Sequence, residues 1–361
     1  MTIPVTIDEF DADWFGEFCD LGDDRRVVGV AAERIAVGEG FLGELARLTL
    51  TYDGAPGPAT VIAKIPTTDS GLKPIGVMLG VYERESRFYR ELVPHLAVRT
   101  AACFYNGADA EADRYALVLE DLGHLEGGDQ AAGMDLDQSR ACVTAAARLH
   151  GRWWDHDLLG GLAWVPKPDN PINMGLQGMY EESWDSLMEQ WGHLYPDQVK
   201  REVERYIPRV SEFLTAGGDS ARTLTHNDFR LDNLFFDGDE VVVLDWQVLG
   251  LGDGMGDLVP LLTTNATGEV RRSHETELLQ LYFDHMRAQG SGPSHFEDLV
   301  RMYRANQMFW LINWGNNAAR ADRGERSDRL FEAVLGRAIE AATEHQPWEV
   351  AHDLEWRPRE D

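Results

Sequence analysis

The chain has 361 residues, of which 43% are apolar, 26% charged and 10% aromatic. This length accommodates two domains or one domain with two lobes, and the aromatic content excludes an intrinsically disordered chain. Acidic residues outnumber basic ones by 62 to 33, and the formal net charge of −29 argues against nucleic acid and anionic membrane surfaces as partners.

The three cysteines and the N-terminal segment indicate the compartment. Cys19, Cys103 and Cys142 lie far apart without metal-ligand spacing, which favours a reducing environment. The first residues, MTIPVTIDEFDADWF, lack the basic region of a signal peptide. No apolar run approaches the roughly 18 residues that a membrane span requires. We therefore expect a cytoplasmic protein.

The first third of the chain predicts a small β-rich lobe. Apolar and polar residues alternate over 31–65 in three runs separated by glycine-rich turns, which is typical of an antiparallel meander. Helical spacing of apolar residues follows over 76–93. Two more strand-like runs, TAACFYNG and YALVLEDL, lead to Gly123, where the pattern changes.

The rest of the chain is dominated by helical patterns. They cover 135–154, 179–195, 197–214 and 274–345, and two strand-like runs joined by a Gly-Asp turn, NLFFDGD and EVVVLDW, interrupt them as a predicted hairpin. We predict an α+β fold with two lobes, an N-lobe over 1–122 and a C-lobe over 123–361, with the nucleotide bound in the cleft between them.

Three glycines form a G-x-G-x-x-G pattern at Gly38, Gly40 and Gly43. In a dinucleotide-binding fold this motif leads from a strand into a helix, whereas here a second strand pattern follows, so that interpretation fails. A glycine hairpin over phosphates and an ordinary hairpin both remain open.

Lys64 lies in the apolar run VIAKIP, where an ammonium group is costly to bury without a partner. Alone it would be read as an edge residue that extends to solvent. Glu85, on the following predicted helix, supplies a carboxylate, and a strand lysine paired with a helix glutamate is the arrangement that kinases use to hold phosphate oxygens. Glu83 and Glu91 are alternative partners.

The segment THNDFRLDNLFF places His226, Asp228 and Asn233 in the spacing H-x-D-x-x-x-x-N. This pattern supplies an acid that accepts a hydroxyl proton and an amide oxygen that binds magnesium. Asp245 ends the apolar run VVVL, where a second metal ligand would be needed, although an aspartate there is often only a turn former.

With these segments and GDGMGDL, the chain resembles the aminoglycoside phosphotransferase and choline kinase-like group of small-molecule kinases, particularly its ecdysteroid kinase-like and bacterial members. The resemblance implies a bilobal protein-kinase-like fold that uses ATP and Mg²⁺. It assigns Asp228 as catalytic base in the motif of His226, and Asn233 and Asp245 as magnesium ligands. It also implies contacts of the Lys64–Glu85 pair with phosphates and of the hinge backbone, Glu120 to Leu122, with adenine.

Two positions depart from the group. Asn227 stands where glycine is common, and Asp245 is followed by Trp-Gln, as in the ecdysteroid kinase-like members. Neither change removes a catalytic group, but both weaken the case for an antibiotic as substrate.

Two other functions agree less well with the sequence. A protein kinase is disfavoured because only eleven residues separate Asp245 from Asp257 and no A-P-E follows, which leaves no room for an activation segment. A nucleotide-binding regulatory protein without catalysis would normally lack a base, lysine or metal ligand, and all are present here.

The expected acceptor is a small molecule with a hydroxyl group. Candidate lining residues are Trp246, Asp257, Trp310 and Trp314, with Trp310 and Trp314 on one helical face. Acidic residues beside Trp184, namely Glu181, Glu182 and Asp185, are candidates to receive amines. Aminoglycoside, amine alcohol, steroid alcohol, sugar and hydroxyacyl thioester all remain open.

Overall fold

The computed structural model describes residues 3–19, 21–22, 25–35 and 42–351. The chain divides into two compact units, Met1–Glu126 with Val242–Val248, and Gly127–Val241 with Leu249–Asp361. The first unit thus includes seven residues, 242–248, that lie far along the chain. The predicted division of functions between lobes meeting at residue 122 stays a prediction.

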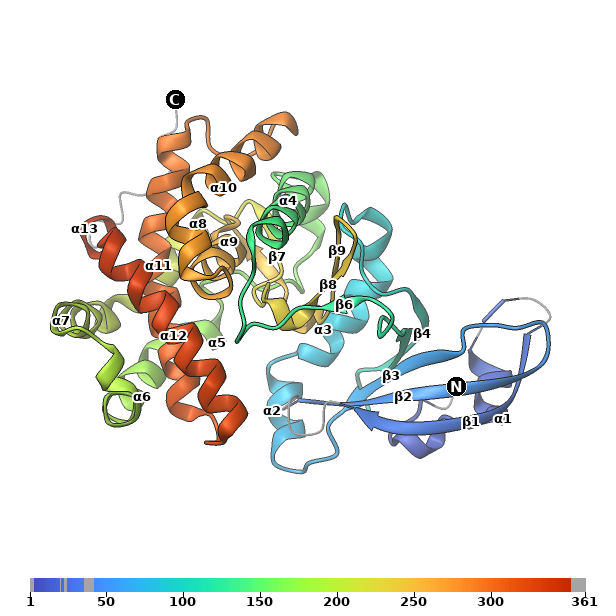
Figure 1. The fold of residues 1–361 in the computed structure, drawn as a ribbon. Coiled ribbons are helices and arrows are strands. Elements are labelled where there is room, and N and C mark those ends of the chain that lie inside the picture. Colours follow the sequence, from blue (N-terminus) through green and yellow to red (C-terminus); the bar gives the residue numbers. More distant parts are fainter. Residues whose placement is uncertain (1–2, 20, 23–24, 36–41, 352–361) are drawn as a thin grey trace. The chain divides into compact units, whose positions relative to one another are not determined.

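The first unit is built on a five-stranded antiparallel sheet of order β1-β2-β3-β5-β4 (Figure 1). Its strands are β1 Arg25–Ile35, β2 Gly43–Gly54, β3 Thr60–Pro66, β4 Cys103–Asp109 and β5 Arg114–Glu120. The alternating pattern and the glycine-rich turns predicted these strands, and the antiparallel sheet excludes a doubly wound parallel fold.

One face of this sheet carries the core of the first unit. Val61, Ala63 and Ile65 of β3 are buried there against Trp14 and Phe15 of α1 (Ala12–Phe18). Because side chains alternate along a strand, Lys64 lies on the opposite face.

The helix expected over 76–93 is interrupted. Helix α2 covers Leu72–Met78, and Gly80 adopts a left-handed φ of +67° before α3 begins at Val81. Glycine tolerates this conformation without a Cβ clash. Helix α3 ends at Arg87 and continues as one π-helical turn, η2, over Phe88–Leu92, which is followed by the short turn η3 (Val93–His95).

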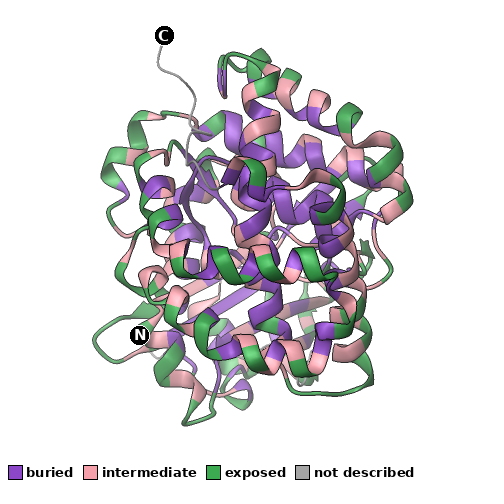
Figure 2. Ribbon diagram, turned by 90° about the vertical axis from the view of Figure 1, so that its left-hand side faces the viewer, coloured by how far each residue is buried: buried purple, intermediate pink, exposed green. Residues whose placement is uncertain are grey.

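The second unit is largely helical, and most of its longer helices bury one side and expose the other, whereas α11 (Phe296–Arg320) exposes few residues (Figure 2). They are α4 Leu136–Trp153, α6 Leu176–Trp191, α7 Asp197–Tyr206, α8 Val210–Asp219, α10 Gly268–Ala288, α11 Phe296–Arg320 and α12 Glu325–His345. Shorter helices are α5 Pro171–Met174, α9 Met255–Pro260 and α13 Trp348–Ala351. The single helix expected over 197–214 is two helices, because Pro208 lies in a 3₁₀ turn between them. No helix within the described ranges is long and apolar enough to cross a membrane.

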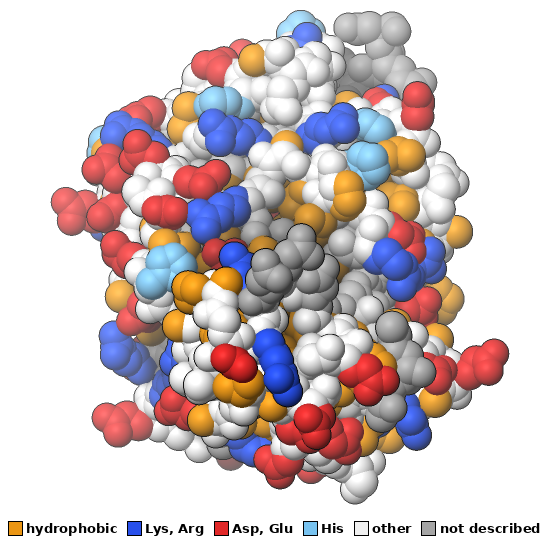
Figure 3. All heavy atoms as spheres, turned by 90° about the vertical axis from the view of Figure 1, so that its right-hand side faces the viewer, with side chains coloured by type: hydrophobic (Ala, Val, Ile, Leu, Met, Phe, Trp, Pro, Cys, Tyr) orange, Lys and Arg blue, Asp and Glu red, His pale blue; other side chains and the backbone are white. Residues whose placement is uncertain are grey.

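Short strands lead into the chemistry-bearing segments. Strand β7 (Thr223–Thr225) pairs antiparallel with β10 (Gly250–Gly252) and ends directly before His226. The remaining strands are β6 Glu126–Gly127, β8 Leu234–Asp237 and β9 Glu240–Val243, and β9 ends two residues before Asp245. Acidic and basic side chains are interspersed over the face shown in Figure 3.

Candidate active site

Three charged side chains of the first unit form a tight cluster. The Lys64 Nζ lies 2.8 Å from Glu85 Oε1 and 2.8 Å from Asp245 Oδ1. The alternatives Glu83 and Glu91 both pair with Arg87 instead. The structure therefore brings together the strand lysine, the helix glutamate and the aspartate that follows β9.

Burial and charge act in opposite directions on this cluster. Burial alone would lower the pKa of the Lys64 ammonium, but the charges of Asp245 and Glu85 outweigh burial and hold that pKa above its usual value. Burial raises the pKa of Glu85, an effect that the Lys64 charge opposes. The lysine is thus fixed as a cation.

The segment that follows β9 is held residue by residue. Asp245 adopts a left-handed φ of +63°, which is uncommon for a residue with a Cβ, although aspartate and asparagine enter this region more readily than most. The next residue, Trp246, is fully buried, and its ring lies parallel to that of Phe88 at 4.2 Å. The Trp246 indole N–H donates to Thr100 Oγ1 and to the Val243 carbonyl.

The hinge residues end β5 in the first unit. The Glu120 carboxylate contacts Arg99 and the Ala102 amide, and the Glu120 amide donates to the Ala102 carbonyl over 2.8 Å. The Leu122 side chain is buried. Of the three loop glycines, Gly43 begins β2, and a Cβ there would lie 3.7 Å from Lys64 Cε. Gly38 and Gly40 lie outside the described residues.

The His226–Asn233 loop belongs to the second unit. Phe229 and Leu231 are buried and anchor it, while the Asp228 carboxylate is partly exposed, at 28%. The Asp228 amide donates to His226 Nδ1 over 3.2 Å. His226 is itself buried and therefore positions the loop from inside.

The Asp228 carboxylate lies between two neighbours from its own loop. Asn233 Nδ2 donates to Asp228 Oδ2 over 2.8 Å, and Arg230 Nε lies 3.1 Å from Oδ1. The same Asn233 nitrogen donates to the Asp228 carbonyl. Both amide hydrogens of Asn233 therefore face Asp228, which leaves its amide oxygen for another ligand.

Asp257 fixes the backbone at the start of this loop. Its carboxylate is fully buried and accepts from the His226 amide over 2.7 Å and from the Asn227 amide over 2.6 Å. Asn227 has a left-handed φ of +63°, a conformation that asparagine tolerates better than most residues with a Cβ. The departure from glycine at this position therefore keeps the loop geometry.

Behind Asp257, two further buried residues continue the network. His150 of α4 places Nε2 3.0 Å from Asp257 Oδ2 and Nδ1 2.8 Å from the Tyr282 hydroxyl of α10. A carboxylate only accepts, so His150 donates a hydrogen bond from Nε2 and accepts one from the Tyr282 hydroxyl at Nδ1. The two helices thereby fix the orientation of the Asp257 carboxylate.

A family model described as "Phosphotransferase enzyme family" matches residues 73–290, which include Glu85, the His226 loop, Asp245 and Asp257. The chain belongs to this family. No curated protein matches the chain.

Solved structures show the same kinase-like α+β fold for this phosphotransferase. A Ralstonia eutropha protein assigned as an aminoglycoside phosphotransferase is 17% identical, covers 95% of this chain and 97% of its own, and has a TM-score of 0.53. The GDP and kanamycin complex of APH(2″)-IIIa is 14% identical, with coverages of 89% and 93% and a TM-score of 0.52. A choline kinase from Cryptosporidium parvum is 13% identical, with coverages of 91% and 92% and a TM-score of 0.52.

The two side chains that the resemblance names for magnesium, Asn233 and Asp245, carry oxygen atoms of the kind that this ion binds, each considered within its own unit. Carboxylate and amide oxygens are the ligands that Mg²⁺ accepts in proteins, and Asn233 presents its oxygen because its nitrogen is used by Asp228. Asp245 keeps 28% of its side chain exposed while Lys64 holds one of its oxygens.

Two of the four acceptor-lining candidates must be withdrawn. Trp246 is fully buried against Phe88, and Asp257 is fully buried beneath the loop, so neither side chain has surface for an acceptor. Trp314 is also buried, with an edge-to-face contact to Phe331, whereas Trp310 is partly exposed. Lining by Trp310 and Trp314 stays a prediction.

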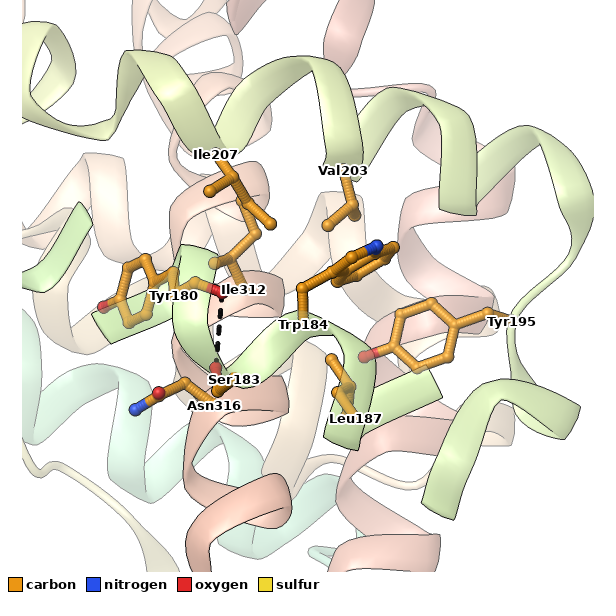
Figure 4. Close-up of a pocket in the computed structure, with 9 residues that line it drawn as sticks. All are labelled: Tyr180, Ser183, Trp184, Leu187, Tyr195, Val203, Ile207, Ile312 and Asn316. Atoms are coloured by element: carbon orange, nitrogen blue, oxygen red, sulfur yellow. Dashed lines mark hydrogen bonds between the residues drawn. The ribbon is translucent and has the colours of Figure 1, made fainter. Parts of the chain in front are cut away.

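A small pocket lies among α6, α7 and α11 of the second unit (Figure 4). Trp184 lines it, but neither Trp310 nor Trp314 does. The buried Tyr195 hydroxyl and Asn316 Oδ1 line it too, without a hydrogen-bond partner among the described residues. Its free space is about that of one water molecule, which is too little for an acceptor.

The sequence did not reveal the supporting residues. Asp257 lies in the segment GDGMGDL and His150 in the helical pattern over 135–154, yet nothing in their spacing showed that they meet. Tyr282 lies in the helical pattern over 274–345, which gives no sign of its contact with His150. The signal that the sequence offered for the contacts among His150, Asp257 and Tyr282 was the position of His150 on the apolar face of a predicted helix.

Proposed function

We propose that this phosphotransferase moves the γ-phosphoryl group of ATP to a hydroxyl group of a small molecule. The observation that carries the proposal is the Asp228 carboxylate, partly exposed on a loop whose backbone is clamped by a buried aspartate. A catalytic base must be exposed enough to contact the acceptor hydroxyl, and its backbone must be held so that the carboxylate keeps one orientation. Family membership supports the same reaction type.

Each residue has a proposed role. Asp228 orients the acceptor hydroxyl and takes its proton, while Lys64, held by Glu85, binds phosphate oxygens. The backbone of Glu120 and Leu122 binds adenine. Asn233 and Asp245 would hold magnesium, which neutralises phosphate charge when bound.

The acceptor class is proposed more broadly. One fold relative was solved with GDP and kanamycin and another is a choline kinase, and both kanamycin and choline carry hydroxyl and amine groups. An acceptor with an amine also suits a chain of net charge −29. The Trp-Gln pair after Asp245 supports the ecdysteroid kinase-like subgroup, which adds steroid alcohols to the panel.

The test is a mass-spectrometric screen for ATP-dependent gain of one phosphoryl group. The panel holds aminoglycosides, amine alcohols, sugars, steroid alcohols and hydroxyacyl thioesters, each with Mg²⁺ and either ATP or GTP. We expect at least one acceptor to gain a phosphoryl group, and Asp228→Asn to abolish that gain. Tight Mg-ATP binding without transfer to any acceptor and without slow hydrolysis would favour the regulatory alternative.

A further inference from the structure

Arg84 lies on α3 directly before Glu85, and its guanidinium bridges two backbone carbonyls of the first unit. Nη1 donates to the Gln247 carbonyl over 3.0 Å, and Nη2 donates to the Leu79 carbonyl over 2.8 Å. Leu79 is the C-cap residue directly after α2, and Gln247 lies two residues after Asp245. One side chain therefore ties the start of α3 to the segment that carries the proposed metal ligand.

The guanidinium of Arg84 has backbone carbonyls, and no carboxylate, as its partners among the described residues. No carboxylate lies within ion-pair distance of Arg84 in the part of the chain that the structure describes, although the sequence holds 62 acidic residues. Its Nε is buried without a hydrogen-bond partner, and burial lowers the pKa of the group. A partly buried cation without a carboxylate partner costs stability unless other groups compensate its charge, and here the two carbonyls are the groups that do so.

The segment that Arg84 holds needs such support. Asp245 has a left-handed φ of +63°, a sparsely populated conformation for any residue other than glycine. A residue of this kind keeps its conformation only when its surroundings fix it. Lys64 holds the Asp245 carboxylate, Phe88 stacks on Trp246, and Arg84 binds the Gln247 carbonyl. Successive residues are thus each fixed by β3 or by the α3–η2 helix.

We infer that Arg84 is a positioning residue that keeps the 245–247 segment docked on helix α3, so that Asp245 is oriented for its ligand before nucleotide binds. The arrangement also explains why residues 242–248 form part of the first unit. Arginine suits this role because its planar group presents donors in two directions at once, which a lysine ammonium on a flexible stem does less well. The link to magnesium rests on the proposed function, whereas the docking itself does not.

The first test is hydrogen exchange in the unliganded protein. Arg84→Met keeps the aliphatic stem and removes the donors, and we expect amides in 242–248 to exchange at least about tenfold faster, while those of β3 are unchanged. Arg87→Met is the matched control, since Arg87 is on the same helix but pairs with Glu83 and Glu91. It should leave exchange in 242–248 unchanged. Equal exchange in Arg84→Met and the parent would overturn the inference.

The second test separates docking from general destabilisation. Arg84→Lys retains the charge and changes the packing less than Arg84→Met does. We expect amides in 242–248 to exchange faster than in the parent in this variant too, by a smaller but detectable factor. In calorimetry, Arg84→Met should raise the magnesium concentration needed for half-maximal Mg-ATP binding by about tenfold and change magnesium-free ATP binding by less than about threefold. If exchange in 242–248 became faster but the magnesium requirement did not change, Arg84 would dock the segment without orienting Asp245 for the metal. If the parent bound no nucleotide, the proposed function would fail while the exchange result still decided the role of Arg84.

Discussion

The Lys64 ammonium lies 2.8 Å from Asp245 Oδ1, although the two residues are 181 positions apart in the sequence. The same nitrogen contacts Glu85, so one cation bridges two carboxylates that come from different elements. A lysine held in this way is charged and fixed in place before a phosphate arrives. Nucleotide binding therefore loses less side-chain conformational entropy.

Lys64→Ala should lower kcat/KM for ATP by about two orders of magnitude, the usual range for losing one donor to developing charge. Glu85→Ala should have a smaller effect, because Lys64 keeps Asp245 as a partner. The double variant should be strongly non-additive, since the two residues act through one ion pair. Steady-state kinetics of the three variants measure this coupling. Glu83→Gln is the control and should match the parent, and an additive double variant would argue against the pair.

Asp245→Ala should impair magnesium-dependent ATP binding more than Asn233→Ala does, by roughly a further tenfold, or about 1.4 kcal/mol. A carboxylate brings a full charge to the metal, whereas the amide brings a dipole. Calorimetry of ATP with and without Mg²⁺ compares the two variants. Equal losses would contradict the ranking.

Tyr282→Phe should destabilise the folded state by about 1–3 kcal/mol, because it leaves His150 Nδ1 buried without its donor. Urea unfolding measures the change. Tyr195→Phe is the matched control, since its hydroxyl is equally buried but has no partner among the described residues. We expect that variant to be close to neutral, and a comparable loss from both would exclude a specific role for the His150 contact.

Asp253→Asn tests a buried acid. Burial raises the pKa of Asp253 to about 6 from an ordinary value of 3.8, so the folded state binds the proton more tightly than the unfolded state. The stability that this contributes is complete below the ordinary pKa and is lost as pH rises through about 6. Asparagine does not ionise, so thermal melts should show a gain over the parent that is larger at pH 8 than at pH 5, by about 1–3 kcal/mol. A gain independent of pH would show that Asp253 does not titrate in this way.

The sequence predicted the sheet and the charged motif but not the residues that hold them in place. Alternation and turn residues determine strands locally, and the Lys64–Glu85 pair follows from a strand and the next helix. Trp246 was expected at an acceptor because it adjoins Asp245, yet its position is decided by stacking on Phe88. Arg84 binds the Gln247 carbonyl and Asp257 binds the His226 amide, so both contacts join segments distant in sequence through backbone groups. Every residue has such backbone groups, so the pattern of side chains in the sequence does not predict these contacts.

The catalytic assignment of Asp228 is the central claim, and Asp228→Asn tests it most directly. Single-turnover phosphoryl transfer, nucleotide binding and a thermal melt are measured together on the parent and the variant. We expect ATP affinity within about threefold, an unchanged melt, and transfer slower by about two to four orders of magnitude, the usual range for losing a general base. An Asp228→Asn protein that melts earlier but transfers phosphate at the parental rate would show that Asp228 only stabilises its loop.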